Sequence, residues 1–312
     1  MTKLDEKEII RIFADKLGIA DLDDVVLLGK GVVFKTDMLV ASTDVPDSME
    51  AWQIARKSIV SCVSDLAAKG VRPHAAMISL GLPENRTRPY VEGLAEGFAI
   101  ASKEFGVKIV GGDTNKANEL VIDCSMVGFA SSGKIPTRKG AGPGDFVVVS
   151  GMFGLPPAGL AILMQNTVAT GAFKKQAAES VLVPKPRQRF GLALAKYFSS
   201  SIDSSDGLAI SLYELASQSR VNIAIENVPA AEGVEKFAQE NGLDAHELVF
   251  HGGEEYEIVA TIPRSKLKQA MAAARKAGTA LHVIGRVQRG AGDVFVGKRL
   301  LENRGYVHFR MR

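Results

Sequence analysis

The sequence is poor in the residues that form disulfides or bind zinc. Its 312 residues include two cysteines, Cys62 and Cys124, which are far apart and lie in separate apolar runs. Two isolated cysteines exclude a disulfide scaffold and a cysteine-based zinc site, and they are typical of a reducing compartment. The sequence starts with charged residues rather than an apolar run, which predicts no signal peptide, so we expect a cytoplasmic protein.

The sequence also lacks a recognisable histidine or cysteine nucleophile. Its five histidines are dispersed and form no H-x-x-H or similar pair. We therefore predict a structural role for each of them: His74, His246, His251, His282 and His308.

Neither sign of charge dominates, and no apolar run is long. The 38 basic and 35 acidic residues give a net charge of +3 and are scattered along the chain, which argues against a dedicated nucleic-acid-binding protein. Charges or glycines interrupt every apolar stretch well before the ~20 residues that span a bilayer, so we expect no membrane segment. Apolar residues make up 46%, which is typical of a globular protein. The length suggests two domains, or one large one, with sizeable cores.

Apolar spacing predicts alternating helices and strands, and thus an α/β fold. The expected helices are 4–17, 46–70, 89–105, 156–166, 187–199, 207–219 and 264–277. The expected strands are a hairpin of 25–28 with 32–34, then 38–40, 71–82, 107–110, 120–129, 146–150, 221–226, 256–262 and 281–287. The glycine-rich turn at 140–145 divides the chain into an N-terminal domain, 1–139, and a C-terminal domain, 140–312.

Two segments resemble phosphate-binding loops but do not fit. Residues 128–135, GFASSGKI, end in Ile135 where a P-loop needs a hydroxyl for magnesium, and Pro136 follows where a helix should begin. A hairpin turn is the better interpretation. The glycines of 140–144 do not have the G-x-G-x-x-G spacing of a dinucleotide site.

The most informative feature is a set of aspartates at the ends of predicted elements or inside apolar ones. Asp65, for example, lies in the apolar helix segment IVSCVSDLAA, where burying a carboxylate is costly without a cation or hydrogen-bond donors. Any one of them could cap a helix or a turn. Together they favour Mg²⁺ held with substrate phosphates in one cleft, and hence phosphoryl transfer or another ATP-using reaction. They are Asp23, Asp24, Asp37, Asp65, Asp113, Asp203 and Asp206.

Two further segments allow both a structural and a functional interpretation. In DSSDGL, Ser205 or Asp206 could cap the next helix, but a helix N-terminus also binds anions. The acidic glycine turn 251–257, HGGEEYE, is either a solvated turn or part of a site.

Taken in order, these motifs resemble those of the thiamine-monophosphate kinase family, within the aminoimidazole-ribonucleotide synthetase-like superfamily. The resemblance covers essentially the whole chain. The matching segments are DDVVL at 23–27, TDMLV at 36–40, SDLAA at 64–68, GGDT at 111–114, DSSDGL at 203–208 and GGEEYE at 252–257.

The resemblance implies an ATP- and Mg²⁺-dependent phosphorylation of thiamine monophosphate to thiamine diphosphate. It also implies two α/β domains and a homodimer whose N-terminal sheets pair into a barrel. Exposed strand edges at 32–40 and 120–129 would favour that pairing. The expected partners are therefore ATP, thiamine monophosphate and a second copy of the chain.

The resemblance also assigns roles to individual residues. The metal positions correspond to Asp24, Thr36, Asp37, Asp65, Asp113, Asp203 and Asp206. The nucleotide positions correspond to Gly112, Asp113, Arg138 and Ser205, and the substrate positions to Asp44, Glu254 and Tyr306. The expected catalytic residues are Asp113, Asp206 and Arg138. At Asp44 the family usually has histidine.

Elementary charge arguments fit such a reaction. The γ-phosphate of ATP and the acceptor phosphate repel each other, and Mg²⁺ ions together with Arg138 could neutralise and align them. The acceptor oxygen is ionised near neutral pH, because its second pKa is about 6, so no general base and no covalent intermediate are needed.

Two alternatives remain at this point: another ATP-dependent enzyme of the superfamily, such as an aminoimidazole-ribonucleotide synthetase, and a non-catalytic nucleotide or metal sensor.

Overall fold

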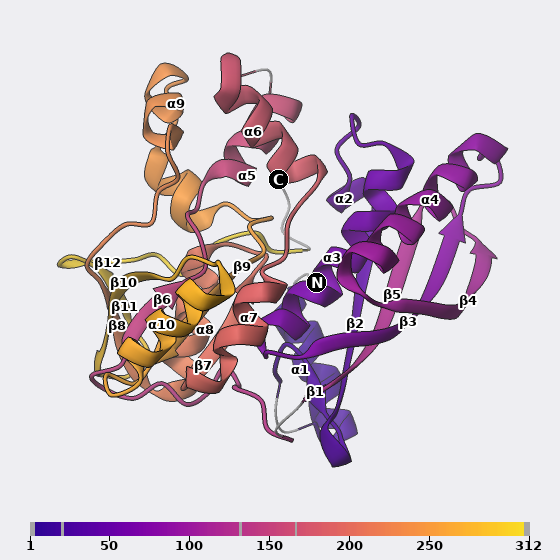
Figure 1. The fold of residues 1–312 in the computed structure, drawn as a ribbon. Helices are drawn as coiled ribbons and strands as arrows, with labels where there is room; N and C mark the ends of the chain where they lie inside the picture. The colour runs from indigo at the N-terminus through magenta and orange to yellow at the C-terminus, as the bar shows by residue number, and fades with distance from the viewer. Residues whose placement is uncertain (1–3, 20–21, 131–132, 166, 309–312) are drawn as a thin grey trace.

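The computed structural model describes residues 4–19, 22–130, 133–165 and 167–308. The chain folds into two α/β halves, each built on one mixed sheet (Figure 1). This confirms the predicted fold class, whereas the domain boundary at 139/140 stays a prediction. Among the described residues, no helix is both long enough and apolar enough to cross a membrane.

The N-terminal half contains a five-stranded sheet with the order β1-β2-β5-β3-β4. Only the β3–β4 pair is parallel. The strands are β1 (Val26–Leu27), β2 (Val32–Val40), β3 (Arg72–Leu82), β4 (Lys108–Lys116) and β5 (Val121–Phe129). The helices are α1 (Glu6–Leu17), α2 (Ala41–Asp44), α3 (Ala51–Ala68) and α4 (Arg88–Phe105), and a short 3₁₀ turn, η1 (Gly29–Gly31), joins β1 to β2.

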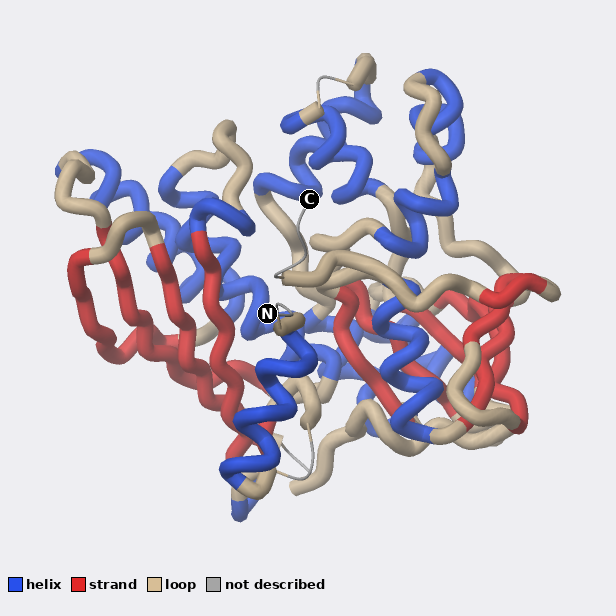
Figure 2. Tube along the Cα trace, turned by 180° about the vertical axis from the view of Figure 1, so that it is seen from behind, coloured by secondary structure: helices blue, strands red, loops and turns tan. Residues whose placement is uncertain are grey.

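One face of this sheet is buried and the other is open. Alternate side chains of β5, including Ile122, Cys124 and Met126, are fully buried in the core beneath α3 and α4. On the opposite face Met38 and Met77 are 60% and 54% exposed. Figure 2 shows this second face without a covering helix.

The C-terminal half contains a seven-stranded sheet with the order β12-β11-β8-β10-β6-β9-β7. Its strands are β6 (Phe146–Val149), β7 (Ser200–Ser204), β8 (Val221–Ile225), β9 (Glu257–Ile262), β10 (His282–Arg289), β11 (Val294–Val296) and β12 (Arg299–Leu300). Its helices are α5 (Leu155–Met164), α6 (Gly171–Leu182), α7 (Gln188–Leu194), α8 (Leu208–Ser219), α9 (Val234–Glu240) and α10 (Leu267–Ala277). A 3₁₀ turn, η2 (Ala195–Tyr197), and a π-helical turn, η3 (Glu247–His251), complete it.

Helix α3 joins the two halves. Its last residues, Ala67 and Ala68, pack in one core with Phe190 and Leu194 of α7. The backbones approach so closely that a Cβ on Gly191 would lie 1.8 Å from the carbonyl oxygen of Ala67. Since α3 also covers the N-terminal sheet, its polar residues lie where the two halves meet.

The structure corrects several predicted elements. Residues 32–34 and 38–40 belong to one strand, β2, and the strand predicted at 107–110 continues through the GGDT segment to Lys116. The N-terminal helix, α3, α4, α5, α8 and α10 are confirmed with small shifts at their ends, whereas the helix predicted at 187–199 breaks into α7 and η2. Helices α6 and α9 and strands β7, β11 and β12 were not predicted.

The rejected P-loop has no P-loop structure. Strand β5 ends at Phe129, and the described residues 133–145 contain no helix. Gly133 N donates a hydrogen bond to Ala130 O, which fits the turn predicted there, although residues 131–132 of that segment lie outside the described residues.

The predicted edges of the N-terminal sheet are partly wrong. β5 is the central strand, paired with β2 on one side and β3 on the other. β2 is an edge for most of its length, because the short β1 pairs only with Val33 and Phe34. The other edge is β4.

Candidate active site

Three buried aspartates converge where α3 meets the two sheets. Asp24 precedes β1, Asp65 lies on α3 and Asp203 lies within β7. They are 5%, 6% and 8% exposed, and each offers a carboxylate oxygen within 4.8 Å of the others. The structure thus brings together three of the predicted metal positions from distant parts of the chain. Asp203 belongs to strand β7 rather than to the turn before a helix, because it pairs with Ile258 of the antiparallel strand β9.

Two lysines accompany these acids. Lys35 Nζ of β2 lies 2.7 Å from Asp65 Oδ2 and 3.8 Å from Asp37 Oδ2. Lys69 Nζ, which is fully buried, lies 2.7 Å from Asp24 Oδ2. Buried carboxylates need such compensation, because transfer of an unpaired charge from water is strongly unfavourable.

Arg138 approaches the cluster from the segment that links the two halves. Its Nε donates to Asp24 Oδ1 at 2.7 Å, and its Nη1 lies 3.6 Å from Glu214 Oε2 of α8. The structure therefore places the predicted cation beside a predicted metal position.

The pKa values reflect crowding of like charges. Burial raises the pKa of Asp65 well above its usual range, which the nearby Lys35 ammonium only partly offsets. Burial and the Asp24 carboxylate raise the pKa of Asp203 to about 6. Burial also tends to raise the pKa of Asp24, but Lys69 and Arg138 hold it below its usual value. A site in which acids retain protons gains from a bound cation.

The donor set fits Mg²⁺. All three groups are carboxylates, and Mg²⁺ binds hard oxygen ligands. Asp24 Oδ2 is buried, and its charged partner is Lys69 Nζ at 2.7 Å. A carboxylate oxygen has two lone pairs, so one remains for a metal beside the lysine.

The remaining metal positions do not all join this cluster. In β2, Asp37 faces α3 with Lys35, whereas Thr36 faces the open side of the sheet, where its hydroxyl donates to Asp123 Oδ1 at 2.9 Å. Asp113 pairs in register with Ser79 and is exposed on the edge strand β4. Within a single chain, Asp113 therefore does not meet the other aspartates in one cleft, and Thr36 also lies apart from the cluster; the metal roles of both residues stay predictions.

The segment DSSDGL begins with Asp203 of the cluster, and its second acid, Asp206, follows three residues later. Burial and the neighbouring Asp203 raise the pKa of Asp206 to about 6. The backbone N–H of Tyr306 donates to Asp206 O at 2.9 Å, and that of Glu254 donates to Ser205 O at 2.6 Å. These bonds bring the predicted substrate residues Glu254 and Tyr306 to the predicted nucleotide and metal residues.

Lys57 of α3 connects two of the three substrate positions, Asp44 and Glu254. Its Nζ donates to Asp44 O at 2.6 Å and lies 2.7 Å from Glu254 Oε2. The Asp44 carboxylate itself accepts from Val40 N at 2.7 Å. The Asp44 side chain is therefore bonded to the backbone at the start of the short helix α2, which Asp44 itself ends. The Glu254 carboxylate is paired with the buried Lys57 ammonium.

Gly112 is required by close packing between strands. It lies in β4 opposite Ile78, and a Cβ there would lie 1.7 Å from the Ile78 carbonyl oxygen. Its position on β4 is separate from the cluster of Asp24, Asp65 and Asp203.

Sequence reasoning missed the lysines of the site and one of its serines. Lys35, Lys57 and Lys69 were not identified, and neither was Ser64, whose hydroxyl donates to Asp203 Oδ2 at 2.9 Å. Lys57 lies within the apolar helix α3 and Lys69 follows at its C-terminal cap, and this apolar setting of two lysines was the available signal.

Comparison with known proteins identifies the family. Residues 22–130 match the family model "AIR synthase related protein, N-terminal domain", and residues 142–298 match "AIR synthase related protein, C-terminal domain". A thiamine-monophosphate kinase of Nitrosopumilus maritimus is 42% identical, over 99% of this chain and 100% of the relative. The chain belongs to the thiamine-monophosphate kinase family. A relative of that name from Pyrococcus horikoshii is 37% identical, over 94% of this chain and 91% of its own.

Solved structures of this family have the same fold. One described as "AaThiL complexed with AMPPCP and TMP" has a TM-score of 0.89 and 29% identity, and the match covers 99% of both chains. Thiamine monophosphate kinase from Aquifex aeolicus has a TM-score of 0.86 and 29% identity, over 95% of this chain and 97% of that one. The family assignment confirms the resemblance inferred from the motifs.

Proposed function

We propose that this protein transfers the γ-phosphoryl group of ATP to thiamine monophosphate, giving thiamine diphosphate by direct transfer. The observation that carries the proposal is the convergence of Asp24, Asp65 and Asp203, with oxygens within 4.8 Å, in a chain that matches the kinases along its length. The related structure with AMPPCP, an ATP analogue, and TMP supports both substrates. A cytoplasmic location remains part of the proposal.

We assign Mg²⁺ to the cluster of Asp24, Asp65 and Asp203, with Asp37 and Asp206 beside it. When bound there, Mg²⁺ would neutralise the phosphate oxygens of ATP and the acceptor. The protein's own part is to fix the carboxylates in place; because the pKa values of Asp65 and Asp203 are raised, binding of Mg²⁺ would displace protons from them. Arg138 is held beside Asp24 and would supply a further positive charge to the phosphates.

The acceptor would bind on the side of the cluster formed by the acidic turn. Lys57 fixes Glu254 there, and the bond from Tyr306 N to Asp206 O holds the C-terminal segment against the same site. Glu254 has a positive φ of 70°, an uncommon conformation for glutamate that directs the turn back toward Ser205. A carboxylate at this position suits the cationic thiazolium ring.

We further propose a homodimer that pairs the open faces of two N-terminal sheets. Phe34, Met38 and Met77 on this face are 42%, 60% and 54% exposed, and large apolar side chains exposed on one sheet face favour burial against a partner. Thr36 and Asp113 lie on the same face, so their assigned roles would depend on the assembled dimer.

The test is a coupled assay with purified protein, Mg²⁺, ATP and thiamine monophosphate, with the products identified by mass. We expect one thiamine diphosphate for each ATP consumed, and no consumption without the acceptor. ATP binding without thiamine diphosphate formation would reject the kinase assignment and favour a different acceptor or a sensor.

A further inference from the structure

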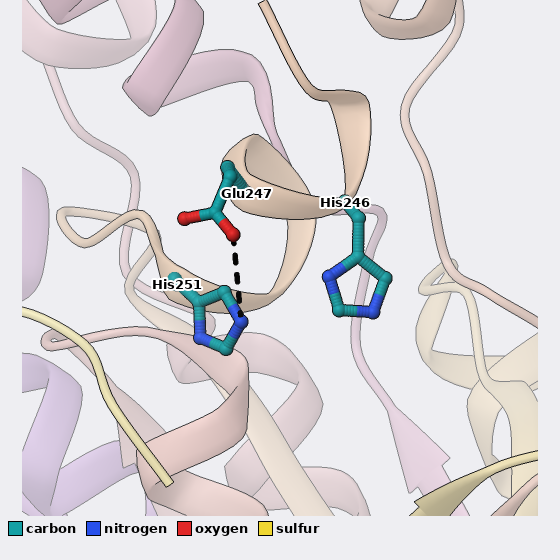
Figure 3. Close-up of side chains that lie close together, drawn as sticks. All are labelled: His246, Glu247 and His251. Carbon is teal, nitrogen blue, oxygen red and sulfur yellow. Dashed lines mark ion pairs between the residues drawn. The ribbon is translucent and has the colours of Figure 1, made fainter. Parts of the chain in front are cut away.

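A second group of ligand-bearing side chains lies away from the aspartate cluster. His246, Glu247 and His251 each offer a ligand atom, and these atoms all lie within 4.8 Å of one another. Figure 3 shows the three side chains gathered around one turn of the chain, with Glu247 directed toward His251. Nothing in the proposed kinase reaction uses them.

The π-helical turn η3 is what brings the two histidines together. Residues five apart on an α-helix point about 140° away from each other, at 100° per residue. Here the chain widens, and Gly252 N donates to Glu247 O at 3.1 Å in the i→i+5 pattern of a π-helix. The ring centroids of His246 and His251 are consequently 5.6 Å apart. Wide turns of this kind occur frequently at functional sites.

His251 is oriented as a metal-binding histidine is. Its side chain is 5% exposed, and its Nδ1 lies 2.9 Å from the carbonyl oxygen of Arg304. A carbonyl only accepts hydrogen bonds, so Nδ1 is the donor, and in the neutral ring the lone pair available to a metal is then on Nε2. That Nε2 lies 4.0 Å from Glu247 Oε1. A backbone carbonyl that fixes the ring in this way is the usual support of a histidine ligand.

We propose that His246, Glu247 and His251 form a binding site for a divalent transition metal of the Zn²⁺ or Co²⁺ kind. Two imidazoles and one carboxylate suit these metals, whereas Mg²⁺ prefers oxygen alone. His246 is exposed, so its ring can move to close the site, and solvent can complete the coordination. The inference does not depend on the kinase assignment.

Arg304 competes with a metal for the same carboxylate. Its Nη1 donates to Glu247 Oε2 at 2.6 Å and its Nη2 contacts Oε1. A metal therefore binds by taking one carboxylate oxygen from the guanidinium, against a nearby positive charge. Two residues further on, Tyr306 N donates to Asp206 O, so Arg304 belongs to the same segment that reaches the aspartate cluster.

Because Arg304 competes with the metal for Glu247, a variant at Arg304 distinguishes a metal site from a lone surface histidine. Arg304→Gln removes the competing charge but keeps the backbone carbonyl that orients His251. A built site then binds metal more tightly, whereas a lone surface histidine binds it no differently. His246→Ala removes an exposed ligand together with its ring contact to Phe250. His282→Ala on β10 is a control outside the cluster.

The experiment is a titration of the full-length protein with Co²⁺, followed by its visible absorption bands, with excess Mg²⁺ present to occupy the carboxylate cluster. We expect binding that weakens about ten-fold or more in His246→Ala. It should strengthen in Arg304→Gln and stay unchanged in His282→Ala. Equal Co²⁺ affinity in the wild type, His246→Ala and Arg304→Gln would overturn the proposal. Thiamine diphosphate formation is measured in a separate assay. A failure of the Co²⁺ titration therefore does not reject the kinase assignment, and inactivity as a kinase does not reject the metal site.

Discussion

Lys35 Nζ lies 2.7 Å from Asp65 Oδ2, so a lysine of the N-terminal sheet neutralises an aspartate of α3 inside the aspartate cluster. Burial alone would lower the pKa of Lys35, but Asp65 and Asp37 raise it above its usual value. The lysine is thus charged throughout the pH range in which the protein would work. Its charge makes the buried acids tolerable before any metal binds.

Lys35→Gln should therefore destabilise the metal-free protein. Removing one partner leaves Asp65 without compensation, which costs about 3 kcal/mol of unfolding free energy for a buried pair. Mg²⁺ should recover part of the loss, because it supplies the missing positive charge. Urea unfolding with and without Mg²⁺ measures both effects. An unchanged stability in Lys35→Gln without metal would show that this ion pair does not support the cluster.

Stability should depend on pH in opposite ways with and without Mg²⁺. The pKa values of Asp203 and Asp206 are raised to about 6, so each binds its proton more tightly in the folded chain than in the unfolded one. Their contribution to stability is complete below about pH 4 and is lost as the pH rises through about 6. Mg²⁺ needs the ionised carboxylates, so its stabilising effect should grow over the same interval.

Thermal unfolding between about pH 5 and about pH 8, in chelator or in Mg²⁺, measures this linkage. Asp203→Asn should flatten the metal-free pH profile and reduce the stabilisation by Mg²⁺, and Asp15→Asn on the exposed side of α1 is the control. A Mg²⁺-induced shift in Tm that is the same at every pH would contradict the assignment.

Lys57 should affect the acceptor more than the nucleotide. It fixes Glu254 and the Asp44 carbonyl, which are the predicted substrate positions. We expect Lys57→Met to raise the KM for thiamine monophosphate about ten-fold, since a small misplacement of a binding group has effects of this size or larger. Steady-state kinetics with each substrate varied measures this, with Lys103→Met as the control. A larger change in the KM for ATP than for the acceptor would place the acidic turn at the nucleotide instead.

The sequence predicted the apolar framework well and the polar site only in part. Helices α3 and α4 were found because their apolar residues recur at helical spacing. Strand β7 was missed because its sequence, SSIDS, is polar, although all five residues are buried. The hydroxyls of Ser200 and Ser201 have partners remote in sequence, as when Ser201 Oγ donates to Ala68 O at 2.7 Å.

Sequence spacing also could not show which predicted metal residues lie in the aspartate cluster and which lie on the open face of the sheet. Whether Thr36 or Asp37 faces α3 depends on the register of β2, which is fixed only by pairing with β5. The pairing of His246 with His251 depends on a π turn that the sequence does not indicate. Lys35 and Lys69 were overlooked because lysines are mostly solvent-exposed, and only the assembled cluster explains their burial.

The open sheet face should hold the homodimer together. Met77→Glu places a charge in the centre of this face and should yield a monomer, because burying an unpaired carboxylate is strongly unfavourable. Sedimentation of this variant measures the change, and Val168→Glu, at a residue that is 70% exposed in the C-terminal half, is the control. A dimer that survives Met77→Glu would place the interface elsewhere.

The central claim is that the buried aspartate cluster carries a kinase reaction. Its most direct test is the rate of thiamine diphosphate formation by Asp65→Asn, compared with Asp15→Asn, at saturating ATP, Mg²⁺ and thiamine monophosphate. We expect Asp65→Asn to lose activity by a factor of about 100 or more, which is typical when a main electrostatic contribution to the transition state is removed. Asp15→Asn should match the wild type. Turnover by a folded Asp65→Asn protein at the wild-type rate would contradict the account.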